Sequence, residues 1–191
     1  MGSDALKFGA NELAEHLKYL FKGFLIHGHV SKIFAFCVLI PLIKNNKNSK
    51  SCSNNYRLIA ISSLIMKLLD HIILHLFKYS FLSNNLQFGF QKNLSTTLCT
   101  WTMIECINYF TKSFDHVRHS LLFKKLRGKI PDIFLRLIIV SYMSQSCCVR
   151  FNNVDSDSFS VVNGVRQGAV ASPVYFNVYL DDLFTLMKSS G

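Results

Sequence analysis

The residues whose types and spacing best suit a binding or catalytic role lie close together near the end of the chain. Two glycines, Gly164 and Gly168, bracket the pair Arg166-Gln167. Glycine lets the backbone come close to a bulky partner, and the two bracketed side chains supply hydrogen-bond donors. This spacing suits a flat, anionic ligand such as a nucleotide. The alternative is an ordinary turn before a surface helix.

The neighbouring elements should position this turn. The run 157–162 reads as a strand before it, and apolar residues from 175 to 183 keep helical spacing after it. Ser172 is expected to cap that helix, with Pro173 at its first position. A strand, a glycine-rich turn and a helix N-terminus together favour anion binding.

The remaining pattern predicts an α+β fold that is rich in helix. Helical periodicity indicates helices over residues 10–27, 62–79, about 95–110, 118–127 and from 131 onwards. Strands are expected at 37–43 and 57–61, joined by a basic loop, and at 147–151 and 159–162, joined through Asn152-Asn153. These strands would form small antiparallel sheets. The length of 191 residues fits one domain or a fragment of one.

The charge distribution points to a polyanionic partner. The formal net charge is +10, and ten lysines and arginines between His16 and Ile104 are opposed only by Asp70, so this region carries about +9. Such a surface attracts nucleic acid. A merely soluble basic protein is the alternative.

Metal-binding and secretory signals are weak. Six cysteines include no C-x-x-C pair, which favours reduced thiols in an intracellular protein of the nucleus or cytoplasm. No signal peptide is expected, and the longest apolar run is too short to span a bilayer. His71 and His75 have metal-ligand spacing on a predicted helix, but no third ligand is near in sequence, so a solvated face is favoured.

Taken together, four motifs resemble those of reverse transcriptases, in the form carried by non-LTR (LINE-type) retrotransposons. The stretch 164–173 resembles G-V-x-Q-G-x-x-x-S-P, and residues 40–59 resemble the fingers hairpin of that family. Segments 87–97 and 111–119 resemble Q-F-G-F-R-K-G-x-S-T and S-K-A-F-D-x-V-x-H. The resemblance implies a fragment of a right-hand polymerase, fingers-like over about 1–98, with an incomplete palm over about 99–191 and no thumb.

The resemblance also implies roles for single residues. Lys44 and Arg57 would hold the triphosphate, which suits the phosphate chemistry of these side chains. Gln167 and Gly168 would lie under the base pair of template and incoming nucleotide, and Phe114 would exclude a ribose 2′-hydroxyl. The implied partners are an RNA template, a DNA primer and a deoxynucleotide.

The catalytic carboxylates of the family are missing from their expected places. DNA synthesis uses two Mg²⁺ ions held by carboxylates, yet the first catalytic Asp falls at Asn108 or Tyr109. Asp115 is the second Asp of its motif, which in the family is not the primary metal ligand. Tyr179-Leu180-Asp181-Asp182 spells the Y/F-x-D-D motif, but it lies in a predicted helix, and the true hairpin would come after Gly191. We therefore assign no catalytic or metal-binding residue and do not expect productive Mg²⁺ binding.

Three functions stay open from the sequence. The first is a truncated reverse transcriptase-like domain, derived from a non-LTR retrotransposon, that we expect to be inactive in DNA synthesis. The second is a non-catalytic nucleic-acid-binding module that keeps the basic fingers. The third is a retrotransposon relic without a selected role, for which Ala171, smaller than the residue usual in the family, would be one sign of decay.

Overall fold

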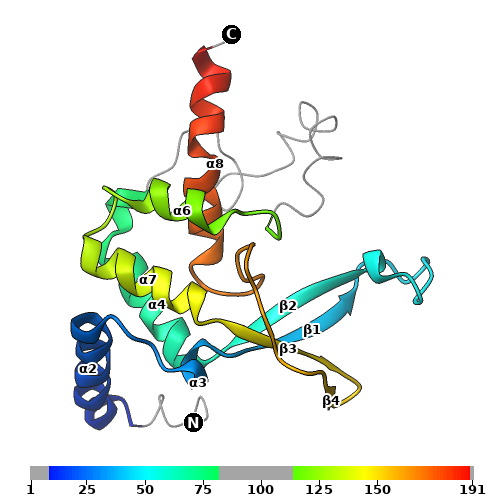
Figure 1. Cartoon of the computed structure of the whole chain (residues 1–191), viewed down its shortest axis with the longest axis horizontal. Helices are drawn as coiled ribbons and strands as arrows, with labels where there is room; N and C mark the ends of the chain where they lie inside the picture. Colours follow the sequence, from blue (N-terminus) through cyan, green and yellow to red (C-terminus); the bar gives the residue numbers. More distant parts are fainter. Residues whose placement is uncertain (1–8, 82–113, 190–191) are drawn as a thin grey trace.

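The computed structural model describes residues 9–81 and 114–189 (Figure 1). The helices in these ranges are α2 (Ala10–His27), α3 (Lys32–Ala35), α4 (Leu64–Leu76), α6 (His119–Leu126), α7 (Asp132–Met143) and α8 (Ser172–Ser189), with 3-10 turns η1 (Ser53–Asn55) and η2 (Lys78–Phe81). The strands are β1 (Cys37–Ile43), β2 (Tyr56–Ser62), β3 (Ser146–Phe151), β4 (Val154–Asp155) and β5 (Phe159–Ser160). The α+β class predicted from the sequence is confirmed.

One mixed sheet joins strands from both halves of the chain. Its order is β2-β1-β3-β4, and β5 also pairs with β3. The β1–β2 hairpin is antiparallel, as predicted, with Cys37 opposite Ser62. However, β1 and β3 run parallel, with Cys37 opposite Cys147, so the expectation of purely antiparallel sheets is wrong at this pairing. Figure 1 shows the β1–β2 hairpin extending away from the helices.

The second hairpin turns where the sequence indicates, but its return strand is interrupted. Asn152 and Asn153 have φ angles of 50° and 62°, which a two-residue type I′ turn requires. The chain pairs again immediately after them, through β4. The N–H of Ser156 then donates to Val149 O at 2.9 Å, and its hydroxyl accepts from Val149 N–H at 3.0 Å. Pairing resumes only at β5, so the predicted strand 159–162 is shorter than expected.

The helices form the hydrophobic core next to the sheet. The apolar faces of α4, α6, α7 and α8 meet in one cluster, whose most deeply buried large side chains include Met66, Ile73, Leu122, Leu126, Leu137 and Tyr175. Helix α2 adds Phe21 and Phe24 to the same cluster. Its C-terminus is tied to α7, because Arg136 donates to the carbonyl of Leu25 at 2.7 Å. The helices predicted over residues 10–27, 62–79, 118–127 and from 131 are therefore present, and they pack as their periodicity indicates.

Helix α8 begins one residue earlier than the sequence suggested. The N–H of Tyr175 donates to Ala171 O at 2.9 Å, so Ala171 occupies the N-cap position. The buried Ser172 hydroxyl caps nothing, and the predicted Ser172 cap is wrong. The gap expected beside Ala171 is small, since the cavity that Ala171 lines measures about 10 Å³.

Several predicted features lie outside the described residues. These are the segment 87–92, the helix over about 95–110, the positions Asn108 and Tyr109, and residues 111–113. Within the described part of the chain, no helix is both long and apolar enough to cross a bilayer. The four cysteines placed there, Cys37, Cys52, Cys147 and Cys148, are free thiols.

Candidate nucleotide-binding site

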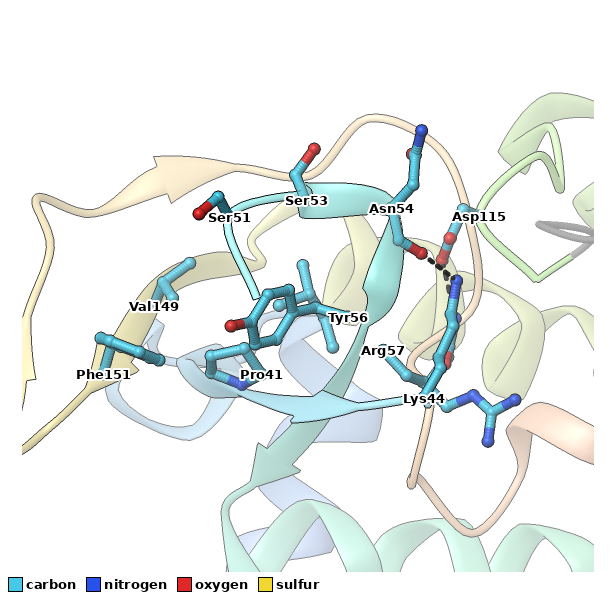
Figure 2. A pocket seen from close by; sticks show the side chains of 12 residues that line it. Pro41, Lys44, Ser51, Ser53, Asn54, Tyr56, Arg57, Asp115, Val149 and Phe151 are labelled. Atoms are coloured by element: carbon cyan, nitrogen blue, oxygen red, sulfur yellow. Dashed lines mark hydrogen bonds between the residues drawn. The ribbon is translucent and has the colours of Figure 1, made fainter. Parts of the chain in front are cut away.

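A pocket of about 560 Å³ lies beside the β1–β2 hairpin (Figure 2). Both strands and the loop between them form much of its wall, and β3 adds apolar side chains. Two distant segments complete it, one at Asp115 and one at Gln167. Its lining consists of Pro41, Lys44, Ser51, Ser53, Asn54, Tyr56, Arg57, Leu58, Asp115, Val149, Phe151 and Gln167. The volume is within the range of small-molecule sites.

The hairpin brings two exposed cations to this pocket. Lys44 follows the last pair of the β1–β2 ladder, and its N–H donates to Asn55 O at 2.8 Å. Its ammonium donates to the carbonyl of Asn54 at 3.0 Å, so the side chain is held against the loop. Arg57 lies on β2, opposite Leu42 of β1, and its guanidinium is exposed. Figure 2 shows this guanidinium extending away from the strand. The predicted pair Lys44 and Arg57 therefore lines one pocket.

Gln167 reaches the pocket from the loop before α8. Its side-chain N–H donates to the Asp115 carboxylate at 3.0 Å. Its backbone carbonyl accepts from the N–H of Ala60 on β2 at 2.6 Å. The loop is thus attached to the strand that carries Arg57, which explains how residues far apart in sequence share one site.

Both glycines of the loop allow close approach, but to the protein itself. A Cβ at Gly164 would lie 3.0 Å from Phe114 O, and a Cβ at Gly168 would lie 3.2 Å from Ala60 O. Their φ angles are 89° and 103°, which L side chains rarely adopt. The glycine spacing predicted a close approach to a ligand. The structure shows that it serves to dock the loop on β2 and on the segment 114–117.

Arg166 points into the protein and not toward a ligand. Its side chain is buried, donates from Nε to Gln145 Oε1 at 2.7 Å and from a terminal nitrogen to Ser141 O at 3.0 Å. Its guanidinium lies 5.0 Å from the ring centre of Tyr142. The prediction that both Arg166 and Gln167 present donors to a ligand is therefore wrong for Arg166, because Ser141 of α7 and Gln145, just after that helix, are its partners.

Asp70 does not line the pocket, but it interacts with the loop that carries Gln167, which was not predicted from the sequence. Burial raises the pKa of its carboxyl to about 6, while Arg166, the N–H of Ala171 and His71 act in the opposite direction. The carboxylate therefore interacts with the loop on both sides of Gln167. The sequence offered one sign, since Asp70 is the lone acid among ten basic residues.

Phe114 lies away from the pocket. Its ring is stacked on Phe176 of α8, with ring centres 4.6 Å apart and an interplanar angle of 14°. It is absent from the lining of the 560 Å³ pocket, whereas its neighbour Asp115 is present. The role of Phe114 as a sugar gate stays a prediction.

Asp181 and Asp182 are part of a helix–helix contact, at a distance from this lining. Asp182 pairs with Lys125 at 3.1 Å, and Asp181 lies 3.9 Å from Lys129. Both acids lie within α8, as the helical spacing predicts, and face a separate hollow of about 310 Å³ next to α6. The residues that match the Y/F-x-D-D motif therefore lie in a helix, and their two acids face lysine side chains.

The described side chains do not fit a pair of Mg²⁺ ions. Such ions need several carboxylates, and Asp115 is the single acid in the described lining of the pocket. Over residues 9–81 and 114–189, no group of three or more His, Cys, Asp or Glu side chains could hold a metal. His71 and His75 are exposed on α4.

Comparison with known proteins agrees with this geometry. Residues 43–190 match the family described as reverse transcriptase (RNA-dependent DNA polymerase). The chain belongs to the reverse transcriptase family. This reverse transcriptase domain is also similar to a Saccharomyces cerevisiae protein named for intron 2 of COX1/OXI3, with 29% identity over 111 residues. The similarity covers 50% of this chain and 12% of the yeast protein.

Proposed function

We propose that this reverse transcriptase domain binds a nucleoside triphosphate beside an RNA–DNA duplex and does not synthesise DNA. The observation that carries the proposal is the convergence of Lys44, Arg57 and Gln167 on one pocket. A finer assignment, to a non-LTR (LINE-type) element, rests on the motif spelling at 164–173. On this assignment, residues from about 1 to 98 act as fingers and those from about 99 to 191 as a partial palm.

The electrostatics of the pocket favour a phosphate chain. Lys44 and Arg57 are exposed cations on one hairpin, and guanidinium binds phosphate through paired hydrogen bonds. Lys47 and Lys50 lie in the loop between the same strands. The 560 Å³ volume leaves room for a base and sugar beyond the phosphates.

The lack of catalysis is inferred from the carboxylates. Two-metal phosphoryl transfer needs acids on neighbouring strands, and the family position of the first acid falls at Asn108 or Tyr109. Neither side chain replaces a carboxylate toward Mg²⁺. Asp181 and Asp182 are paired with lysines of the α6 region, which argues against their use as substitutes.

Calorimetric titration with unmodified ATP and dATP tests the nucleotide site. Arg57→Ala removes a charge-assisted contact worth about 1.5–3 kcal/mol, so we expect affinity to fall about 10-fold to 100-fold. Arg127→Ala, which removes an arginine exposed near α6, is the matched control and should bind as the wild type does. Wild-type protein that binds neither nucleotide would contradict the proposal. Equal losses in the two variants would contradict it as well.

A non-catalytic nucleic-acid-binding module is the second candidate. The observation in its favour is the charge of about +9 between residues 16 and 104. This candidate predicts binding to an RNA–DNA hybrid whose affinity falls steeply with salt, together with no binding of ATP or dATP. The two titrations therefore separate the candidates.

A further inference from the structure

Two buried cysteines lie opposite each other where the first and second halves of the chain meet in the sheet. Cys37 begins β1, Cys147 lies in β3, and the register of these parallel strands pairs the two residues. Figure 1 shows β1 and β3 next to each other. Register partners on neighbouring strands carry their side chains on the same face of a sheet. Both thiols are free, and a hydrogen bond joins their side chains.

The backbone geometry of this pair suits a disulfide. Neighbouring strands lie about 4.7–4.9 Å apart, and a disulfide usually joins residues whose Cα atoms are about 4.4–6.8 Å apart. Because Cys37 and Cys147 face each other directly across β1 and β3, they meet this requirement. The next residue of β3, Cys148, is opposite Val38 and has its side chain on the other face.

The surroundings of the two sulfurs make them chemically different. Gln145 donates through Nε2 to Cys147 Sγ at 3.4 Å. The hydrogen bond from Cys37 lowers the pKa of Cys147 against the effect of burial, and Gln145 and the guanidinium of Arg166 act in the same direction. The same hydrogen bond, together with burial, raises the pKa of Cys37. Cys147 is therefore the sulfur that is more readily ionised, and a thiolate is the nucleophilic form of cysteine.

A cavity beside Cys147 has room for a small oxidant. Its volume is about 230 Å³, and its lining includes Cys147, Gln145, Phe159 and Arg166. One water molecule takes up about 30 Å³ in the liquid, so a molecule the size of hydrogen peroxide fits. Cys147 is fully buried from solvent, and this cavity is the route by which we expect a small oxidant to reach it.

We propose that Cys37 and Cys147 form an oxidation site, at which a hydroperoxide converts the two thiols into a reversible disulfide between β1 and β3. The Cys147 thiolate attacks one oxygen of hydrogen peroxide, and an S–O bond forms as the O–O bond breaks. The hydroxide that leaves takes up a proton and becomes water. The Cys37 sulfur then attacks the Cys147 sulfenic acid and gives up its proton, and a second water leaves. The two thiols lose two electrons in total, which the peroxide accepts.

The disulfide would join two strands whose residues are far apart in sequence. It would close the long loop between Cys37 and Cys147 and thereby restrict the unfolded chain, which stabilises the folded form. Neither cysteine belongs to the described lining of the 560 Å³ pocket. The inference is therefore independent of nucleotide binding and stands or falls without it.

Peptide mass spectrometry of the 191-residue chain after treatment with hydrogen peroxide tests the inference. Remaining thiols are alkylated under denaturing conditions before digestion. We expect a peptide with Cys37 to be linked to a peptide with Cys147 in more than half of the molecules, and dithiothreitol to release the two peptides. Oxidation should also raise the midpoint of thermal unfolding by about 5 °C or more.

Single substitutions show which cysteines are needed. Cys37→Ala and Cys147→Ala should each abolish the linked peptide and the rise in the unfolding midpoint. Cys148→Ala is the matched control, because Cys148 is a buried cysteine of the same strand without a cysteine opposite it. It should keep the linked peptide and the rise. Each midpoint is compared with that of the same variant in its reduced form, so a loss of stability caused by the substitution itself does not affect the comparison.

The identity of the linked cysteines decides the outcome. In the folded chain, Cys147 should pair with Cys37 at least 10-fold more often than with any other cysteine, and unfolding in urea before oxidation should remove this preference. An absence of the Cys37–Cys147 peptide, at peroxide concentrations that oxidise the exposed Cys52, would overturn the inference. The same preference in urea would show that the fold does not position the pair, and would overturn it as well.

Discussion

The backbone N–H of Ala60 on β2 donates to the carbonyl of Gln167 at 2.6 Å. This bond joins the strand that carries Arg57 to the loop that carries Gln167. Strand β2 and the loop with Gln167 are therefore held together as one wall of the pocket. A substitution that separates them should lower both the stability of the fold and the affinity for nucleotide.

The substitution Gly168→Ala should separate strand β2 from the loop that carries Gln167. The new Cβ would lie 3.2 Å from both Ala60 O and Ile59 Cγ2, at a φ of 103° that alanine rarely adopts. We expect the free energy of unfolding to fall by about 1–3 kcal/mol, measured by urea denaturation. Gly23→Ala is the matched control, because it lies in α2 with nothing within 4 Å of the added Cβ. It should instead raise stability by about 0.5–1 kcal/mol. Similar effects of the two substitutions would contradict this account.

Asp70 should give a pH-dependent contribution to stability. Burial raises the pKa of its carboxyl from 3.8 to about 6. Between these values the folded chain binds more protons at Asp70 than the unfolded chain does, so the free energy of unfolding falls as the pH rises through this window. Above this pH window, the ionised carboxylate lowers the free energy of unfolding by up to about 3 kcal/mol.

Asp70→Asn removes that titration. The stability of the variant relative to the wild type should therefore rise between pH 4 and pH 7, by up to about 3 kcal/mol. Urea denaturation at both pH values measures the difference. Asp157→Asn controls for the loss of a carboxylate on an exposed segment. A constant difference between Asp70→Asn and the wild type at the two pH values would show that burial of Asp70 carries no such cost.

Asp182→Asn should have little effect. The Asp182 side chain is 71% exposed, and its partner Lys125 also donates to the carbonyl of Tyr179, so the free energy of unfolding should fall by less than about 1 kcal/mol. The affinities for ATP and dATP should not change, since Asp182 is absent from the pocket lining. A loss of nucleotide affinity as large as that in Arg57→Ala would place this acid at the site.

Local patterns predicted much of the fold. Helical periodicity located α2, α4, α7 and α8 because each buries one apolar face, and the polar run after Ile43 located the β1–β2 turn. The parallel pairing of β1 with β3 could not be read in this way. It joins Cys37 to Cys147, and no local pattern specifies a partner so far along the chain.

The site was predictable in part. The resemblance to the family implied phosphate contacts for Lys44 and Arg57 and a base-pair contact for Gln167, and the structure brings all three to one pocket. The direction of Arg166 was not predictable, because its partners Ser141 and Gln145 lie on a different segment. Whether a donor in a turn faces a ligand or the core depends on such tertiary contacts.

Primer extension on an RNA template tests the central claim most directly. The claim is that the chain holds a nucleotide but lacks the acids for two-metal chemistry. With dATP well above its measured dissociation constant, and with Mg²⁺ or Mn²⁺ present, we predict that the primer stays at its original length. Template-dependent addition of nucleotides by purified protein of this length, abolished by Asp115→Asn, would contradict the account.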